Sequence, residues 1–127
     1  MNFNNNLSIL LVEDNELNQR LMKISLTRYN YNVSIAVNGL EGVEMFKKQK
    51  FDLILMDIMM PVMDGFEATR EIRNIESQNK NGKIPIIAFT ANTINNDREK
   101  CIQGGMDDIL EKPFDINKFR EILSSLP

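Results

Sequence analysis

The sequence predicts an α/β domain, a (βα)5 fold in which five parallel strands and five helices form a doubly wound sheet. Two observations support this fold class. Short apolar runs bounded by turn-forming residues recur along the chain, and segments with apolar residues at three- and four-residue spacing lie between them. Short strands that alternate with helices are typical of βαβ units. The 127 residues suit one domain with a single core.

The first two strands and the helix between them are well marked. The apolar run Ser8–Val12 predicts a buried strand, and Asp14 or Asn15 can cap a helix that extends to Asn30. Residues 32–36 alternate in the manner of a half-buried edge strand. The apolar positions of the helix are Leu17, Leu21, Met22, Ile24 and Leu26.

The central segment predicts a helix, a strand, a turn and a second helix. Asn38 and Gly39 begin a helix that reaches about Lys48, Phe51–Asp57 predicts a fully buried strand, and Met60–Gly65 forms the turn. In the first of these helices Leu40, Val43 and Phe46 face inward. The second helix carries Phe66, Thr69, Ile72 and Ile75. Met59, Met60 and Met63 could form a promiscuous binding surface, but we expect a buried turn instead.

After a loop over 79–82, the last third of the chain predicts two more strands and two more helices. These elements are a strand over 84–89, a mostly polar helix from about 94 to 103, a strand over 107–111 and a helix over 116–126. Only Ile94, Cys101 and Ile102 anchor the polar helix. The last helix carries Ile116, Phe119, Ile122 and Leu123 on one face.

Composition narrows the possible functions. The net charge of −3 gives no basic surface, so we expect no nucleic-acid binding. The single Cys101 suits a reducing compartment and a packing role. Residues 1–6 resemble a short polar arm before a domain over 7–127, without signal-peptide features. No stretch has the length of a membrane helix, and we expect a cytoplasmic protein or a cytoplasmic piece of a larger one.

The chain contains no histidine. A Ser-His-Asp triad and a zinc site with histidine ligands are therefore impossible on this chain. If phosphate chemistry takes place here, any phosphohistidine must come from a partner protein.

Polar residues follow four of the predicted strands. Glu13 and Asp14 follow the first strand, Asp57 ends the third, Thr90 follows the fourth and Lys112 follows the fifth. The flavodoxin-like strand order 2-1-3-4-5 would make the first and third strands neighbours, about 4.8 Å apart. Three carboxylates brought together in this way repel one another, and Mg²⁺, which prefers carboxylate oxygens and pairs with phosphate, would relieve the repulsion.

This set of residues fits phosphoryl transfer. Asp57 is the natural nucleophile, because a carboxylate can form an aspartyl phosphate. The four-carbon stem of Lys112 can cover much of the roughly 10 Å between its strand and that of Asp57, and Thr90 offers a hydroxyl donor between them. Singly, each residue is more often a solvated loop residue or a helix cap. Their joint placement at four strand ends favours a site.

Four motifs resemble the receiver domain of two-component response regulators. They are Ile9-Leu-Leu-Val-Glu-Asp-Asn15, Asp57-Ile-Met-Met-Pro-Val-Met-Asp-Gly65, Pro85-Ile-Ile-Ala-Phe-Thr-Ala-Asn92 and Gly105-Met-Asp-Asp-Ile-Leu-Glu-Lys-Pro113. The resemblance covers residues 7–126. Within the motifs, the sequences Glu-Asp-Asn and Thr-Ala-Asn are most similar to those in receivers of hybrid sensor histidine kinases and phosphorelays.

The resemblance implies a phosphoacceptor role for Asp57, with a partner histidine kinase or histidine phosphotransfer protein as the donor. It implies that Asp14, Asp57 and the backbone carbonyl of Met59 hold Mg²⁺, or Mn²⁺ in its place, and that Glu13 acts through a metal-bound water. Thr90 and Lys112 would contact the phosphoryl oxygens. The residues expected to modulate the site are Met59, Ala91, Asn92, Ile109 and Pro113, the last through a cis Lys112–Pro113 bond.

One position departs from the family pattern. Ile109 stands where such domains commonly carry Tyr or Phe, so the aromatic half of the usual switch is missing. We expect the sparsely anchored fourth helix to shift on phosphorylation nevertheless, and an apolar Met59 to hinder the water that would hydrolyse the phosphate. The resemblance also implies a possible homodimer face formed by the fourth helix, the fifth strand and the fifth helix.

Two other function classes compete with this interpretation. A phosphatase of the haloacid dehalogenase type would need a second aspartate where Met59 stands. We expect the chain to have no independent catalytic domain, and no catalysis beyond Mg²⁺-assisted phosphorylation and dephosphorylation of Asp57. A receiver-like interaction module that is never phosphorylated remains the main alternative. The sequence leaves open whether the chain acts alone or within a hybrid kinase.

Overall fold

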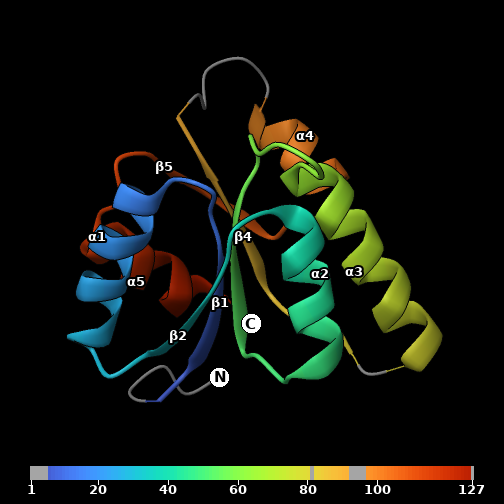
Figure 1. Ribbon diagram of the computed structural model, residues 1–127, viewed down its shortest axis with the longest axis horizontal. Coiled ribbons are helices and arrows are strands. Elements are labelled where there is room, and N and C mark those ends of the chain that lie inside the picture. The colour runs from blue at the N-terminus through green and yellow to red at the C-terminus, as the bar shows by residue number, and fades with distance from the viewer. Residues whose placement is uncertain (1–5, 81, 92–96, 127) are drawn as a thin grey trace.

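Five parallel strands form a single sheet in the computed structural model, which describes residues 6–80, 82–91 and 97–126. The strand order is β2-β1-β3-β4-β5, which confirms the predicted topology. The strands are β1 (Ser8–Val12), β2 (Asn32–Ala36), β3 (Leu53–Asp57), β4 (Ile86–Thr90) and β5 (Asp108–Glu111). Because all five run the same way, their carboxyl ends share one edge of the sheet, at the top of Figure 1.

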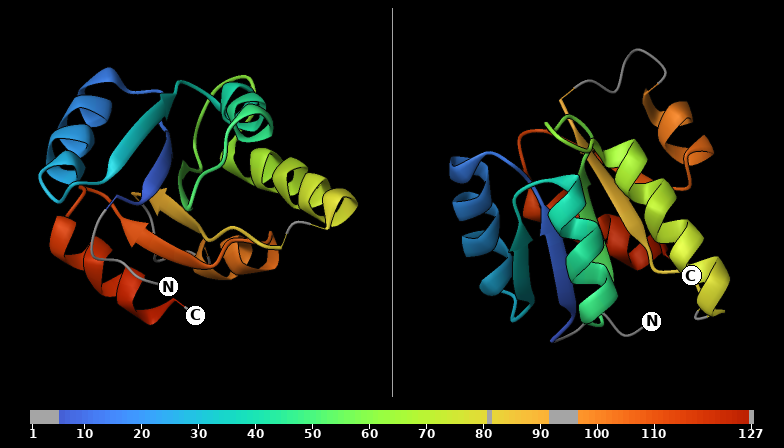
Figure 2. Two further views of the ribbon diagram at one scale, coloured as in Figure 1. Left: turned by 90° about the horizontal axis from the view of Figure 1, so that it is seen from below. Right: turned by 45° about the vertical axis from the view of Figure 1, so that its right-hand side comes forward.

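Helices cover both faces of the sheet. The helices are α1 (Glu16–Thr27), α2 (Gly39–Lys48), α3 (Gly65–Asn79), α4 (Asp97–Gln103) and α5 (Ile116–Ser125). Figures 1 and 2 show α1 and α5 on one face and α2, α3 and α4 on the other. β3 is buried along its whole length, whereas β2 at the edge is half-buried, as the sequence predicted.

Side chains at the helix starts explain why the helices begin where they do. The Asn15, Asn38 and Asp115 side chains each accept a hydrogen bond from a backbone N–H in the first turn of α1, α2 and α5. α3 begins with a capping box, in which Asp64 accepts from the Glu67 N–H and the Glu67 side chain accepts from the Asp64 N–H. The turns that leave the strands are therefore fixed locally.

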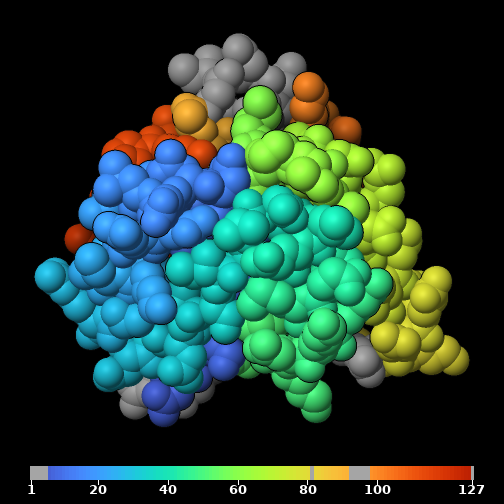
Figure 3. Space-filling view, in the orientation of Figure 1, coloured from blue at the N-terminus to red at the C-terminus, as the bar shows by residue number. Residues whose placement is uncertain are grey.

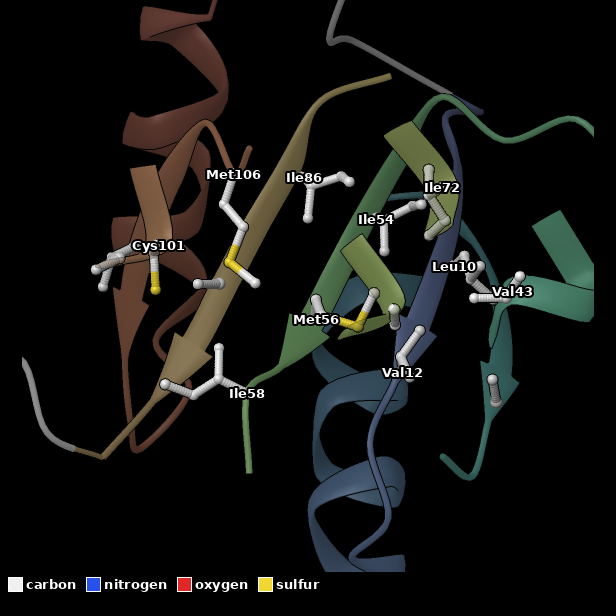
Figure 4. Packing of buried hydrophobic residues seen from close by; sticks show 14 residues of the cluster. Leu10, Val12, Val43, Ile54, Met56, Ile58, Ile72, Ile86, Cys101 and Met106 are labelled. Atoms are coloured by element: carbon white, nitrogen blue, oxygen red, sulfur yellow. The ribbon is translucent and has the colours of Figure 1, made fainter. Parts of the chain in front are cut away.

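The sheet separates two apolar clusters. One lies under α2, α3 and α4, and Figure 4 shows its side chains, which include Leu10, Ile54, Met56 and Cys101. The other lies under α1 and α5 and includes Leu55, Phe89 and Phe119. Alternate residues of each strand enter opposite clusters, as the pleat of a two-sided sheet requires.

Several apolar positions that support the helix predictions are exposed in the structure. Leu17, Leu21 and Ile24 are 65%, 54% and 53% exposed, because α1 turns its Met22–Leu26 face to the sheet and this apolar stripe lies around the helix from that face. Leu40 is also exposed, in the first turn of α2. The predicted buried turn is only partly buried, since Met59 is 75% exposed.

Most of the other predicted strands and helices are present, but some begin or end at different residues than predicted. β3 and β4 each begin two residues later than expected, and α1 ends at Thr27 before Asn30 takes a left-handed φ of 66°. The expected start of the fourth helix near Ile94, and all but one residue of the 1–6 arm, lie outside the described residues. Within the described segments, none of the helices has the length and apolar character needed to cross a bilayer.

A polar network ties α3 to the amino-terminal edge of the sheet. Arg73 donates to the Glu76 carboxylate at 2.8 Å, to Asp107 at 3.0 Å and to the Gly105 carbonyl oxygen at 2.9 Å. Glu76 in turn accepts from the Ile84 N–H at 2.6 Å. Because charges at this depth are stabilised only when paired and hydrogen-bonded, the network fixes α3 against β4 and the connection that leads from α4 to β5.

Candidate functional site

The four strand ends predicted from sequence meet at the carboxyl edge of the sheet. Glu13 and Asp14 follow β1, Asp57 is the last residue of β3, and Thr90 is the last residue of β4. One oxygen from each of the three carboxylates lies within 4.8 Å of the others. β1 and β3 are hydrogen-bonded neighbours, and this pairing is what brings the acids together.

Glu13 is fully buried in spite of its charge. Its carboxylate accepts hydrogen bonds from the Asn15 N–H at 2.9 Å and from the Asn18 side-chain amide at 3.3 Å. Burial raises the pKa of Glu13 to about 7, and the nearby Asp57 carboxylate adds to the rise, although the Asn15 hydrogen bond and Lys112 oppose it. Without a further cation, Glu13 is thus partly protonated at neutral pH.

Asp57 is 1% exposed, and its contacts leave it directed into the site. Its Oδ1 accepts from the Met59 N–H at 3.1 Å and lies 3.3 Å from the Lys112 Nζ. The same ammonium is 4.0 Å from Glu13 Oε1. The lysine is close to two of the three carboxylates in the cluster, so the site carries excess negative charge that a divalent cation would balance.

Thr90 and Lys112 complete the far side of the site. Thr90 is buried next to Asp57, on the strand between Asp57 and β5. The Lys112 N–H donates to the Thr90 carbonyl oxygen at 2.8 Å, which fixes where the lysine leaves the sheet. The Lys112–Pro113 peptide is cis, as the family resemblance implied.

The remaining predicted positions differ in their surroundings. Met59 and Ala91 are exposed beside the site, whereas Asn92 lies outside the described residues. Ile109 is buried with Cys101 and Met106 in the cluster under α4, on the opposite face of the sheet from Phe89. Its aliphatic side chain fills the place expected for an aromatic ring.

Three supporting contacts were not predicted from the sequence. Asn18 contacts Glu13 from the first turn of α1, and the Gln19 amide donates to the Glu13 carbonyl oxygen at 2.7 Å. The five-residue spacing from Glu13 to Asn18 across a predicted helix start could have indicated the first contact. Phe89, whose ring lies under the Lys112 ammonium, was read only as an apolar strand residue.

Glycine allows the loop after β3 to pack tightly. A Cβ atom on Gly65 would lie 2.5 Å from the Asp57 carbonyl oxygen, and one on Gly39 would lie 2.3 Å from the Met63 carbonyl oxygen. Side chains cannot fit at either place. The Gly39 N–H instead donates to Met63 at 3.1 Å, so α2 and the loop after β3 support each other beside the acids.

The donor set fits Mg²⁺. Hard oxygen ligands from two or three carboxylates at a partly open edge are what this ion binds in proteins, with water and phosphate oxygens completing its shell. Asp14 is exposed and Asp57 is buried, so together they could hold an ion at the rim of the site. When bound, Mg²⁺ would neutralise charge on a phosphoryl group next to Asp57.

Comparison with known proteins identifies relatives for nearly the whole chain. The response regulator receiver domain matches residues 9–124. Hybrid signal transduction histidine kinase B of Dictyostelium discoideum is 46% identical over 113 residues, which cover 83% of this chain and 6% of that protein. The chain spans only 7%, 6% and 3% of the length of three such kinases.

Two solved structures share the fold. The receiver domain of the sensor histidine kinase PA1611 from Pseudomonas aeruginosa, with a magnesium ion coordinated in its active site cleft, has a TM-score of 0.83 and 44% identity over 94% of this chain and 95% of that one. The receiver of Ssk1 from Saccharomyces cerevisiae, solved with the histidine phosphotransfer protein Ypd1, has a TM-score of 0.89 and 30% identity over 97% and 90% of the two chains.

Proposed function

Because this chain belongs to the response regulator receiver domain family, we propose that Asp57 accepts a phosphoryl group from the histidine of a partner protein. The partner is a histidine kinase or a histidine phosphotransfer protein. The observation that carries this assignment is the buried Asp57 carboxylate at a strand end, 3.3 Å from the Lys112 ammonium and within 4.8 Å of Glu13 and Asp14. Nucleophile, cation and metal ligands are thus assembled in one place.

The transfer follows from this geometry. An Asp57 oxygen forms a bond to phosphorus while the bond between phosphorus and the partner's imidazole nitrogen breaks, and the electron pair of that bond stays on the nitrogen. Asp14 and Asp57, with the Met59 carbonyl, would hold Mg²⁺, and Glu13 would contact it through water. Lys112 and Thr90 would donate to phosphoryl oxygens as negative charge redistributes.

Phosphorylation of the isolated protein by acetyl phosphate tests the proposal. In Mg²⁺, intact mass should increase by one phosphoryl group in the wild type and should not change in Asp57→Asn. Asp52→Asn is the matched control, because Asp52 immediately precedes the opposite end of the same strand and should leave the reaction unchanged. No added mass on the wild type, or equal addition to Asp57→Asn, would support the interaction module that is never phosphorylated.

The exposed apolar stripe of α1 offers a place for the partner to dock. Leu17, Leu21 and Ile24 recur at the spacing of one helix face, and in Figure 3 no other segment lies in front of α1. Met59 and Val62 add exposed apolar area in the loop after Asp57, at 75% and 77% exposure. A helix that carries the donor histidine could pack along this stripe with its histidine at Asp57.

A charge on the stripe should separate docking from chemistry. Leu21→Asp should slow transfer from a phosphorylated histidine phosphotransfer protein by about tenfold, yet leave the acetyl phosphate reaction at the wild-type rate, because Leu21 is half-exposed and lies outside the acid cluster. Ile102→Asp, on the exposed side of α4, is the matched control. Equal effects of the two variants on transfer would show that the donor docks elsewhere.

Several finer properties belong to the same proposal. Mn²⁺ should replace Mg²⁺, since both bind carboxylate oxygens. The face formed by α4, β5 and α5 should mediate a homodimer when Asp57 is phosphorylated. We also propose that output runs through protein contacts in the cytoplasm without nucleic-acid binding, which the net charge of −3 supports.

A further inference from the structure

Lys112 has a third neighbour besides the two carboxylates. Its Nζ lies 5.2 Å from the centre of the Phe89 ring, within the distance at which an ammonium is attracted by the face of an aromatic ring. Phe89 is 2% exposed, so water is excluded from this contact on the side of the ring. The ammonium is thus held between an acid cluster and an aromatic surface.

The topology of the sheet dictates this contact. Asp57 ends β3, Lys112 follows β5, and β4 lies between these strands. Leu55, Phe89 and Leu110 belong to the cluster under α1 and α5. Asp57 lies two residues after Leu55, and Lys112 lies two residues after Leu110. Side chains alternate along a strand. On this face Phe89 is the last residue of β4 and is paired in register with Asp57, so the lysine must cross it to reach Asp57.

Two further aromatic rings hold the Phe89 ring in place within the apolar cluster. Phe114 packs against it nearly edge to face, with ring centres 6.2 Å apart and an interplanar angle of 73°. Phe114 in turn packs on the fully buried Phe119, with ring centres 5.8 Å apart. These contacts leave the ring little freedom to turn away from the lysine.

We propose that Phe89 is a positioning residue that holds the Lys112 ammonium toward the group on Asp57. This inference rests on the proposed function, because the held group is the phosphoryl group or its mimic. An aliphatic side chain would preserve the apolar packing but would lose the attraction between cation and ring. The lysine would then spend more time in solvent, to which 25% of its side chain is already exposed.

Fluorination of one ring tests the electrostatic part of the proposal. Replacing Phe89 by 4-fluoro- and then 3,4,5-trifluorophenylalanine weakens the negative face of the ring with little change of shape. The apparent dissociation constant for beryllofluoride in saturating Mg²⁺ should rise stepwise along this series, by about threefold to tenfold at the end. The same series at Phe119, which is fully buried in the same cluster, should leave the constant unchanged.

A second measurement does not depend on phosphate chemistry. In the metal-free protein, the ring current of Phe89 should shift the Lys112 ε-methylene protons upfield, and Phe89→Leu should abolish that shift while Phe119→Leu keeps it. A constant beryllofluoride affinity along the Phe89 series, or an unshifted lysine signal in the wild type, would overturn the inference. If the wild type takes up no phosphate from acetyl phosphate, the proposed function fails instead.

Discussion

Burial separates Glu13 from Asp14, its neighbour in the sequence. Asp14 is exposed, whereas Glu13 is enclosed beside Asp57 and has its pKa raised to about 7, mainly because burial disfavours its charged form. Such an arrangement makes the folded state take up a proton that the unfolded chain would release. The chain contains no histidine, so few other side chains titrate near pH 6 to confuse the effect.

This difference predicts how stability depends on pH in the metal-free protein. The folded pKa of Glu13, about 7, exceeds its ordinary value of 4.5, so the folded state binds more protons between these values. The free energy of unfolding should therefore fall as pH rises from about 4.5 to 7, by about 3 kcal/mol in total from Glu13. Urea unfolding in EDTA at several pH values measures it.

Two variants isolate the contribution of Glu13. Glu13→Gln should remove most of this fall, because the amide does not titrate. Glu16→Gln, an exposed acid in the first turn of α1, should keep the wild-type profile. Identical pH profiles for Glu13→Gln and the wild type would show that burial does not raise this pKa.

The sequence predicted the location of a residue correctly where that location depends on chain position, and it failed where the location depends on the orientation of a helix or loop. Asp57, Thr90 and Lys112 were predicted at strand ends, and parallel strands place such ends together. The exposure of Leu17 and Met59 depends on how α1 and a loop are turned against the sheet, which apolar spacing alone does not specify. The Phe89–Lys112 contact likewise depends on the face of β4 from which the ring projects.

At the scale of elements, α4 has little apolar anchoring along its length but is attached to α3 just beyond its carboxyl-terminal end. Cys101 is fully buried, whereas Ile102 is 45% exposed, so within residues 97–103 the apolar anchoring is slight. Beyond the helix, the Met106 N–H donates to Cys101 at 2.9 Å and Arg73 holds the Gly105 carbonyl oxygen. The end of α4 is therefore tied to α3, while the helix itself has few buried contacts.

This asymmetry predicts how α4 responds to phosphorylation without an aromatic residue at position 109. Amide exchange in α4 should be faster than in α3, because local stability follows buried contacts, and it should change when beryllofluoride and Mg²⁺ are added. The α3 amides around Arg73 serve as the internal control. Exchange rates in α4 that are identical with and without the mimic would exclude this helix as the responding element.

At the scale of the whole molecule, the converging acids link metal binding to folding. Asp57 is distant in sequence from the adjacent residues Glu13 and Asp14, and the three carboxylates come together only when β1 and β3 pair. An ion that binds the assembled acids therefore binds the folded chain in preference to the unfolded one. The fold was predictable as a whole because most of its strands and helices carry a cap or an apolar pattern of their own. The exact ends of these elements depend on local turns.

Mg²⁺ should accordingly stabilise the protein in proportion to its binding. At a concentration one hundred times the dissociation constant, the gain is about 2.7 kcal/mol, or roughly 10 °C in Tm. Asp14→Asn should lose most of this gain without a folding defect, since Asp14 is exposed, and Asp52→Asn should retain it. A Tm that Mg²⁺ raises equally in both variants would place the ion elsewhere.

The direction of the strands has a consequence for how the domain can be connected. β1 begins at the edge of the sheet opposite Asp57, and α5 runs back from Lys112 toward that same edge, as Figures 1 and 2 show. A tether that approaches the domain from this opposite edge would leave the carboxyl edge of the sheet, where Asp57 lies, unobstructed. A donor domain on the same polypeptide could then deliver its histidine by swinging around the receiver, at an effective concentration set by tether length.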